Sequence, residues 1–152
     1  MLDIFIKKNG VDAELIPLAH EVRTVSDAVK ATGIPAENHA KSILFICSNK
    51  EPVVVVLLGT DRVDYKKLKE LMNVKDVRLA EPDEVEEITG FEVGGVPPIG
   101  FYGVKTIVDP DVLKKDKVAC GGGDIKTEMI IKAKHIEEFG YEVEVADVKR
   151  EN

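Results

Sequence analysis

The sequence is poor in the residues that most often mark metal sites, disulfides and membrane segments. Tryptophan is absent, and only two cysteines occur, Cys47 and Cys120. They form no C-x-x-C pair and lie near no histidine at zinc-ligand spacing, so we expect two buried, reduced thiols and no metal site. The longest apolar run, residues 52–59, is far shorter than the roughly 20 residues that span a bilayer, and the first residues lack the basic start of a signal peptide. These absences predict a cytoplasmic protein with no membrane partner.

Positive charge is also scarce. Lys and Arg number 21 against 28 for Asp and Glu, which gives a formal net charge of −7. Tight, non-specific binding to a nucleic-acid backbone needs the opposite sign, so the composition disfavours that class of function. A nucleic-acid substrate would require a local basic patch and weak, transient contact. The densest basic stretch contains Arg62, Lys66, Lys67 and Lys69, although the three lysines also suit a solvated helix face.

The chain has a balanced globular composition with clear helix and strand signals. With 152 residues, 44% hydrophobic and 32% charged, it suits one soluble domain over residues 1–152. Capping residues and apolar periodicity predict helices at residues 2–10, 24–32, 65–72, 83–88 and 133–139. Runs rich in β-forming residues predict strands at 11–18, 43–47, 53–58, 106–109, 118–120, 129–131 and 141–145. The polar turn at 48–52 joins two of these into an antiparallel hairpin, which we expect at the centre of the sheet.

Lys41 is a lone cation at the point where a loop becomes a very apolar strand. Most lysines in such places are simply solvated. If the side chain points into a cleft instead, partial desolvation would favour pairing with a phosphate or polarisation of a carbonyl. Lys41 is therefore the first candidate for a functional residue.

Two glycine-rich segments follow. Gly94, Gly95 and Gly100, with Pro97 and Pro98 between them, predict a stiff loop that exposes main-chain N–H groups. Such a loop is either a structural turn or an oxyanion hole, because rigid donors stabilise developing charge best. Residues 121–123 are three glycines directly after a predicted strand. They form either a bulge or turn, or a space for a nucleotide or an amino-acid side chain.

Read in order, these pieces resemble the YbaK/ProX/EbsC family between residues 13 and 136. The similarity begins at His20 and the segment TVSDA, continues through the lysine strand AKSILF, and includes TGFEVGGVPPIG. The remaining pieces are residues 53–59, 61–68, 79–80, 108–109 and Gly121. Each piece is short, but their order and spacing together are specific to the family.

The resemblance implies a trans-acting editing hydrolase that cleaves the ester of mischarged tRNA, related to the editing domain inserted in some prolyl-tRNA synthetases. It implies a single α+β domain whose mixed, largely antiparallel sheet curves into an open barrel with flanking helices. The implied partner is aminoacyl-tRNA, held transiently by its 3′ end, with an aminoacyl-tRNA synthetase as a further candidate. No cofactor is implied.

The resemblance also implies a site in a cleft between Lys41 and the glycine-proline loop. In that family the lysine is thought to hold the tRNA 3′ end, and the loop to lie against the scissile carbonyl. The implied catalytic residues are Lys41, Gly94, Gly95, Pro97, Pro98 and Gly100, and the implied substrate-binding residues are His20, Asp109, Gly121 and Gly122. Asp109 equally suits a helix cap before Pro110. The chain departs from its relatives after Gly121, where they often carry basic residues, and this leaves the amino-acid specificity open.

The residues themselves favour neither covalent nor metal catalysis. His20, His39 and His135 lie in no nucleophile motif, and there is no G-x-S-x-G. Positioning and electrostatics remain: a water or the vicinal ribose hydroxyl attacks an activated ester while loop amides stabilise the oxyanion. Two other interpretations stay open, a non-catalytic tRNA-binding or synthetase-associated module, and a Schiff-base or phosphate-binding protein built on Lys41 and residues 121–123.

Overall fold

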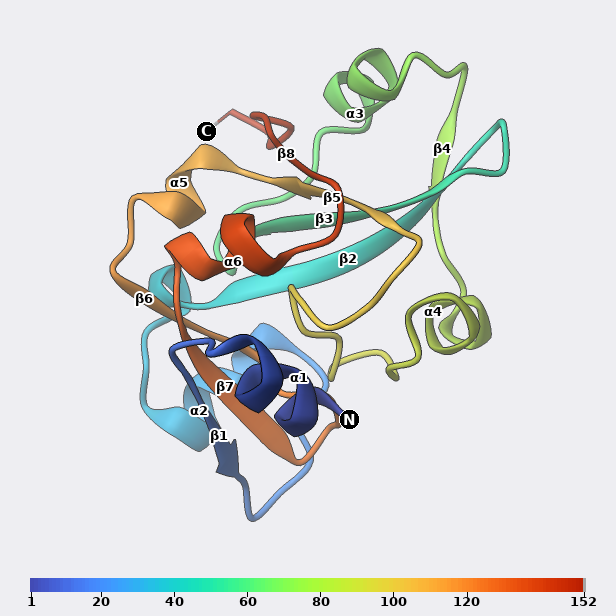
Figure 1. Cartoon of the computed structure of the whole chain (residues 1–152). Helices are drawn as coiled ribbons and strands as arrows, with labels where there is room; N and C mark the ends of the chain where they lie inside the picture. The colour runs from blue at the N-terminus through green and yellow to red at the C-terminus, as the bar shows by residue number, and fades with distance from the viewer. Residues whose placement is uncertain (152) are drawn as a thin grey trace.

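Residues 1–151 are described by the structure, a computed structural model (Figure 1). The helices are α1 (Leu2–Asn9), α2 (Val25–Thr32), α3 (Tyr65–Met72), α4 (Pro82–Thr89), α5 (Pro110–Leu113) and α6 (Lys134–Phe139), with the 3-10 helix η1 (Ala36–Asn38). The strands are β1 (Ala13–Pro17), β2 (Ala40–Cys47), β3 (Pro52–Leu58), β4 (Val77–Leu79), β5 (Lys105–Val108), β6 (Lys117–Gly121), β7 (Thr127–Lys132) and β8 (Val143–Val145).

The larger sheet has the strand order β4-β2-β3-β5-β8 and is built around the β2–β3 hairpin (Figure 1). The hairpin pairs antiparallel from Ala40 opposite Leu58 to Ile46 opposite Pro52, whereas β5 and β8 add in parallel. The central position expected for the hairpin is confirmed, since β3 is the middle strand. Residues 53–57 of β3 have no exposed surface. A strand covered on both faces needs apolar side chains throughout, which explains its run of valines.

The smaller sheet, of order β1-β7-β6, is antiparallel throughout. It meets the larger sheet at a parallel bridge between His39 and Ala119. The α+β class, with mixed, largely antiparallel strands and flanking helices, is confirmed, but the strands divide into two sheets. The division arises along the outer edge of β2, because β6 approaches only the start of that strand and β4 pairs only with its end.

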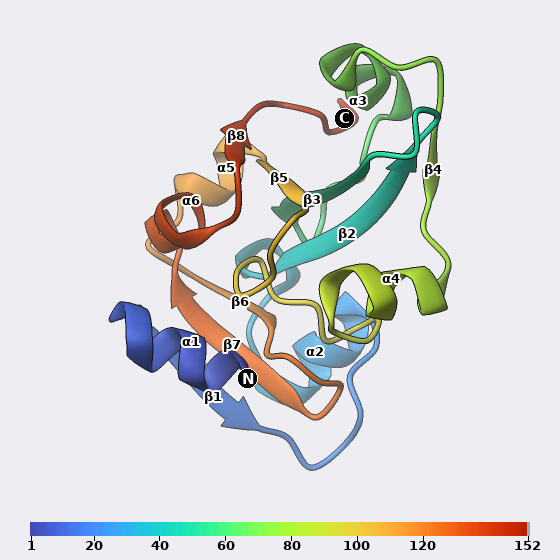
Figure 2. The same ribbon diagram turned by 45° about the vertical axis from the view of Figure 1, so that its right-hand side comes forward.

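Successive side chains of β2 point to opposite faces of the larger sheet. Leu44 and Ile46 join the apolar core shared with α4, β6 and β7. Phe45 and Cys47 join a separate apolar core that includes Leu68 of α3. In Figures 1 and 2, α2 and α4 lie below β2, and α3 lies above it. This alternation decides which β2 side chains can contribute to a given site.

Local signals place most of the helices where they were expected. Thr24 caps α2 and exchanges hydrogen bonds with Asp27 in a capping box. Asp64 caps α3 by accepting two main-chain N–H groups. Pro82 opens α4, and Gly90 ends it in the left-handed conformation that glycine adopts without strain. These boundaries confirm the predictions because caps depend on residues only a few positions apart.

The short elements η1 and β4 were not predicted, and α5 was anticipated only through the possible cap at Asp109. With three residues, β4 is too short to show a periodic pattern, and it forms by pairing with Phe45–Cys47 of β2. The α5 turn begins at Pro110 with Asp109 as its cap. β2 also starts earlier than predicted, at Ala40, so Lys41 lies inside the strand. No helix among residues 1–151 has the length and apolar character needed to cross a membrane.

Candidate active site

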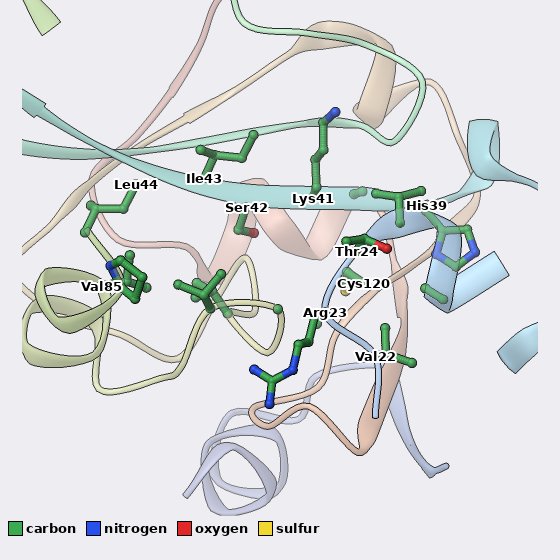
Figure 3. A pocket seen from close by; sticks show the side chains of 18 of the residues that line it. Val22, Arg23, Thr24, His39, Lys41, Ser42, Ile43, Leu44, Val85 and Cys120 are labelled. Carbon is green, nitrogen blue, oxygen red and sulfur yellow. The ribbon is translucent and has the colours of Figure 1, made fainter. Parts of the chain in front are cut away.

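A cleft of about 530 Å³ lies along the first half of β2, between the starts of α2 and α4 (Figure 3). Its walls also include the loop after α4 and the facing ends of β6 and β7. The apolar lining includes Val22, Val25, Ala28, Leu44, Val85 and Val96, and the polar lining includes Arg23, Thr24, His39, Ser42, Glu81 and Glu128. An apolar cavity of this size with a few polar groups is typical of small-molecule sites.

The cleft exists because β4 leaves part of β2 unpaired. β4 pairs with Phe45–Cys47, and the Ala80 N–H donates to the Leu44 carbonyl at 3.0 Å. Before Leu44, β4 no longer follows that edge of β2, and Ser42 borders the cleft there. Its Oγ atom is buried and has no hydrogen-bond partner within residues 1–151. An unpaired buried hydroxyl is costly, so this group is available to a ligand.

Glycines let three loops pack main chain against main chain around the cleft. Gly94 has a φ of 91°, and an added Cβ would come within 2.8 Å of the Arg23 Cα. At Gly95 an added Cβ would lie 2.7 Å from the Asp124 Cα, and the Gly95 carbonyl accepts the Gly123 N–H at 2.8 Å. These glycines therefore hold the cleft wall together, and Gly94 also borders the cavity, whereas the Gly95 N–H donates to the Glu92 carbonyl at 2.9 Å.

The glycines at 121–123 serve the same close packing. A Cβ on Gly121 would clash with the main chain of Val96, and one on Gly122 would lie 2.6 Å from the Thr127 carbonyl oxygen. The space beside Gly122 is thus filled by the protein itself rather than left for a nucleotide. Gly121 borders the cleft, whereas Gly122 borders a second hollow beside α1.

Of the remaining predicted loop residues, few reach the cleft. Pro97 and Pro98 are buried, and Gly100 lies against Leu2, where an added Cβ would be 3.0 Å from its side chain. His20 is exposed in the connection after β1 and does not line the cavity. The structure therefore brings Gly94 and Gly121 together at the cleft and leaves these four residues outside its lining.

The Lys41 side chain lies on the opposite side of β2 from Ser42 and Arg23 (Figure 3). Lys41 thus borders the cleft through its main chain, while its Nζ donates to the Gly59 carbonyl at 3.4 Å. Burial lowers the pKa of Lys41, with the charge of Asp61 acting in the opposite direction. Lys41 and Gly94 of the expected site line the same cleft, but the Lys41 ammonium points away from it because alternate strand residues point to opposite faces.

Asp109 lies in a charged cluster away from the cleft. Its carboxylate has no exposed surface and accepts hydrogen bonds from Lys149 Nζ at 3.0 and 3.2 Å. It also accepts the Asp111 N–H at 2.8 Å, which is the helix-cap geometry left open by the sequence. Burial lowers the pKa of Lys149, but the hydrogen bonds to Asp109 and Asp111 outweigh it and hold that pKa well above its usual value. The pKa of Asp61 is raised, mainly because the carboxyl is partly buried and secondly because of the nearby negative charge of Asp109.

Two buried titratable residues at the cleft were not identified from the sequence. His39 is 2% exposed and Glu128 is 3% exposed, and both line the cavity. His39 Nδ1 lies 3.4 Å from Glu128 Oε1, and Nε2 lies 3.0 Å from the Ile34 carbonyl oxygen. The one local signal was a glutamate within an otherwise apolar strand. Their pairing depends on the contact between β2 and β6–β7, which no local pattern reveals.

Both cysteines are buried and free, as expected. Cys120 lines the cleft, and burial raises the pKa of its thiol, with the charge of Glu128 adding to the shift. Its Sγ atom donates to the Met129 carbonyl at 3.6 Å. A thiol held in its protonated form is a poor nucleophile, which disfavours cysteine catalysis. Across residues 1–151, no three His, Cys, Asp or Glu side chains gather in a way that could hold a metal ion.

Comparisons with known proteins identify the family of this chain. The model of a family described as an aminoacyl-tRNA editing domain matches residues 19–139. The chain is 36% identical over 100 residues to a proline--tRNA ligase of Nitratidesulfovibrio vulgaris strain Hildenborough, covering 66% of this chain and 17% of the ligase. A proline--tRNA ligase of Caldicellulosiruptor bescii is 31% identical over 118 residues, which cover 78% of this chain and 20% of the ligase. The chain therefore spans about one fifth or less of the length of these relatives.

Two solved structures match nearly the whole chain. The hypothetical protein APE2540 has a TM-score of 0.87 and 29% identity, covering 98% of this chain and 99% of its own. A proposed trans-editing enzyme for prolyl tRNA synthetase has a TM-score of 0.84 and 28% identity, and the match covers 96% of this chain and 92% of that protein. The fold of this chain is thus also found in proteins of similar length.

Proposed function

Because the chain belongs to the aminoacyl-tRNA editing domain family, we propose that it is a trans-acting deacylase that hydrolyses the ester of mischarged tRNA. The family supplies the general role in tRNA editing. The cleavage reaction, action in trans, transient binding of the tRNA 3′ end and a cytoplasmic location are our proposal. An aminoacyl-tRNA synthetase that releases the mischarged tRNA is a candidate partner.

The observation that carries the proposal is the cleft beside β2. Its apolar walls suit a small amino-acid side chain, and its buried polar groups include Ser42, His39 and Glu128. One methylene changes binding in such a pocket by only about 1–3 kcal/mol, so selection by size alone is modest. The cleft therefore supports recognition of a small aminoacyl group rather than of a long stretch of RNA.

The main chain can supply the electrostatic part of the reaction. Gly94 and Val96 line the cleft, and neither N–H donates to an acceptor within residues 1–151. We assign them to the carbonyl oxygen of the ester, where fixed donors stabilise the negative charge that develops during attack. Water adds to the carbonyl carbon, the bond to the ribose oxygen breaks, and that oxygen takes up a proton from the water. The products are the free amino acid and uncharged tRNA.

Lys41 enters the proposal as a contact to the tRNA 3′ strand rather than to the ester. Its ammonium makes one long hydrogen bond and, within residues 1–151, no ion pair shorter than 4.0 Å. Arg62 is close enough to influence its titration. Two cations on this face could take a phosphate after displacing Asp61, whereas the aminoacyl group would occupy the cleft on the other side of β2.

The reaction is tested by measuring release of labelled amino acid from a panel of aminoacyl-tRNAs. The tRNA for proline, mischarged with alanine or cysteine, is tested first because the curated relatives are proline--tRNA ligases. We expect rapid hydrolysis of one mischarged species and little of correctly charged prolyl-tRNA. Binding without hydrolysis of any species would favour the alternative, a non-catalytic tRNA-binding module.

The role of Lys41 is tested with Lys41→Ala on two substrates, the full aminoacyl-tRNA and the same amino acid esterified to adenosine. Loss of a phosphate contact should raise KM for the tRNA by about tenfold or more and leave the short ester nearly unaffected. Lys8→Ala, which removes an exposed charge on α1, is the matched control and should affect neither. Equal loss on both substrates would instead place Lys41 in the chemical step.

A further inference from the structure

The buried pair of His39 and Glu128 has a defined arrangement at the cleft. The Ile34 carbonyl can only accept a hydrogen bond, so His39 Nε2, 3.0 Å away, carries a hydrogen. If the imidazole were neutral and Glu128 ionised, two acceptors would then face each other at 3.4 Å, Nδ1 and Oε1. A hydrogen on Nδ1 lets His39 donate to Glu128 Oε1, orient the ionised carboxylate and leave Oε2 as an acceptor.

Glu128 has no other polar partner that would satisfy it. No hydrogen-bond donor contacts its carboxylate within residues 1–151 apart from the His39 ring, and the Ser42 Oγ atom on the same cleft is also unpaired. Arg23 lines the cleft as well, but its guanidinium pairs with Glu21 at 3.2 Å, and both side chains are more than half exposed. The cleft thus contains two hydrogen-bond acceptors, the Glu128 carboxylate and Ser42 Oγ, that a donor group on a ligand could satisfy.

An aminoacyl ester carries one such donor close to its reacting carbon. The α-ammonium nitrogen is two bonds away from the carbonyl carbon, so a carbonyl held at Gly94 and Val96 places the ammonium within the same cavity. A positively charged donor forms the strongest hydrogen bonds with a carboxylate. No other part of a small aminoacyl group combines charge and several N–H donors.

We propose that Glu128, positioned by His39, binds the free α-ammonium of the aminoacyl group and so restricts the site to amino acids with an unblocked amine. This inference rests on the proposed deacylase function. An N-acyl group removes the positive charge and all but one N–H. It also adds bulk on the side where His39 and Glu128 are almost fully enclosed. The enzyme would therefore spare N-acylated species, a class that includes peptidyl-tRNA.

The test compares the aminoacyl-tRNA that the wild type cleaves with its N-acetyl derivative. The wild type should hydrolyse the free-amine substrate with a kcat/KM about 10- to 100-fold higher, the range expected for losing a charged hydrogen bond. Glu128→Gln keeps the shape but not the charge, and should bring that ratio close to one, mainly by raising KM for the free amine. His39→Gln should lower the same ratio, a readout that a loss of stability would not change.

A second His–Glu pair provides the matched control. His135 Nδ1 lies 3.3 Å from Glu138 Oε2 on α6, outside the cleft, with the Glu138 side chain 47% exposed. Glu138→Gln removes an equivalent pair and should leave the preference for the free amine unchanged. If Glu128→Gln does not fold, calorimetry on the wild type replaces it. Adenosine carrying the amino acid through a 3′-amide should then bind more tightly than its N-acetyl form.

Equal hydrolysis of both substrates by the wild type, or an undiminished preference in Glu128→Gln, would overturn the inference while leaving the deacylase proposal intact. In the calorimetric version, equal affinity for the two amides has the same meaning. If the wild type hydrolysed no aminoacyl-tRNA, the proposed deacylase function would be wrong, and the inference that depends on it would be wrong as well.

Discussion

On one face of β2, Ser42 and Leu44 border an apolar cleft, while on the other face Lys41 lies among charged groups of the β3–α3 connection. The charged groups farther along that second face are largely satisfied by one another. Asp109 is fully enclosed yet bound twice by Lys149. Within residues 1–151, the cleft face instead keeps an unpaired Ser42 hydroxyl and a Glu128 carboxylate whose ion-pair partner is His39.

This difference separates residues that hold the fold from residues that are ready for a ligand. A buried charge that is paired and hydrogen-bonded has no remaining need for another partner. A buried polar group without a partner is costly, so a ligand in the cleft would gain by bonding to the Ser42 hydroxyl. We therefore expect substitutions in the Asp109–Lys149 cluster to change mainly stability, and substitutions at the cleft to change mainly hydrolysis.

The largest effect on stability is expected for Lys149→Met, which leaves the buried Asp109 carboxylate without its cation. The free energy of unfolding should fall by about 3 kcal/mol, the low end for a buried pair because Lys149 is partly exposed. Urea denaturation measures this change. Lys114→Met, which breaks an exposed pair with Asp111, should cost no more than about 1 kcal/mol. Similar losses in the two variants would show that the Asp109–Lys149 pair is not stabilising.

An intermediate effect is expected for Gly94→Ala at the cleft wall. The left-handed φ should cost about 1–2 kcal/mol, and the Cβ would also push against Arg23. Hydrolysis should fall by more than the loss of stability accounts for, because the wall moves. Gly103→Ala is the control, since its φ is 78° but an added Cβ meets nothing within 4 Å. Thermal unfolding and single-turnover rates of both variants separate the two costs, and equal rates would contradict a role for Gly94 in shaping the cleft.

The smallest effect concerns Glu84 at the start of α4. Its hydrogen bonds to Arg78, with help from the Glu81 N–H, lower the pKa of Glu84 from 4.5 to about 2. A carboxyl with a lowered folded-state pKa stabilises the fold above its unfolded pKa, and that contribution is lost as pH falls from 4.5 towards 2. In Arg78→Ala the pKa should rise but stay below 4.5, because the Glu81 N–H remains. An NMR titration measures it, and an unchanged pKa would rule out Arg78 as the main cause.

Sequence reasoning located the hairpin and most helices because their signals are local. The cap of α2 at Thr24 and that of α3 at Asp64 depend on contacts two or three residues away. It also identified the glycines that shape the cleft wall. The structure explains the glycine at position 94, because its φ lies in the left-handed region that glycine favours. Asp109 was correctly considered as a helix cap, but its partner Lys149 was not anticipated.

The sequence by itself determined the helix caps, the buried β3 strand and the family to which the chain belongs, because these depend on neighbouring residues and on the order of short motifs. Only the tertiary structure decided that the Lys41 ammonium and the glycine loop lie on opposite sides of β2. It also decided that His39 and Glu128 meet at the cleft. Both outcomes depend on how one strand is placed between two sheets, and that placement results from packing over long sequence separations rather than from any local pattern.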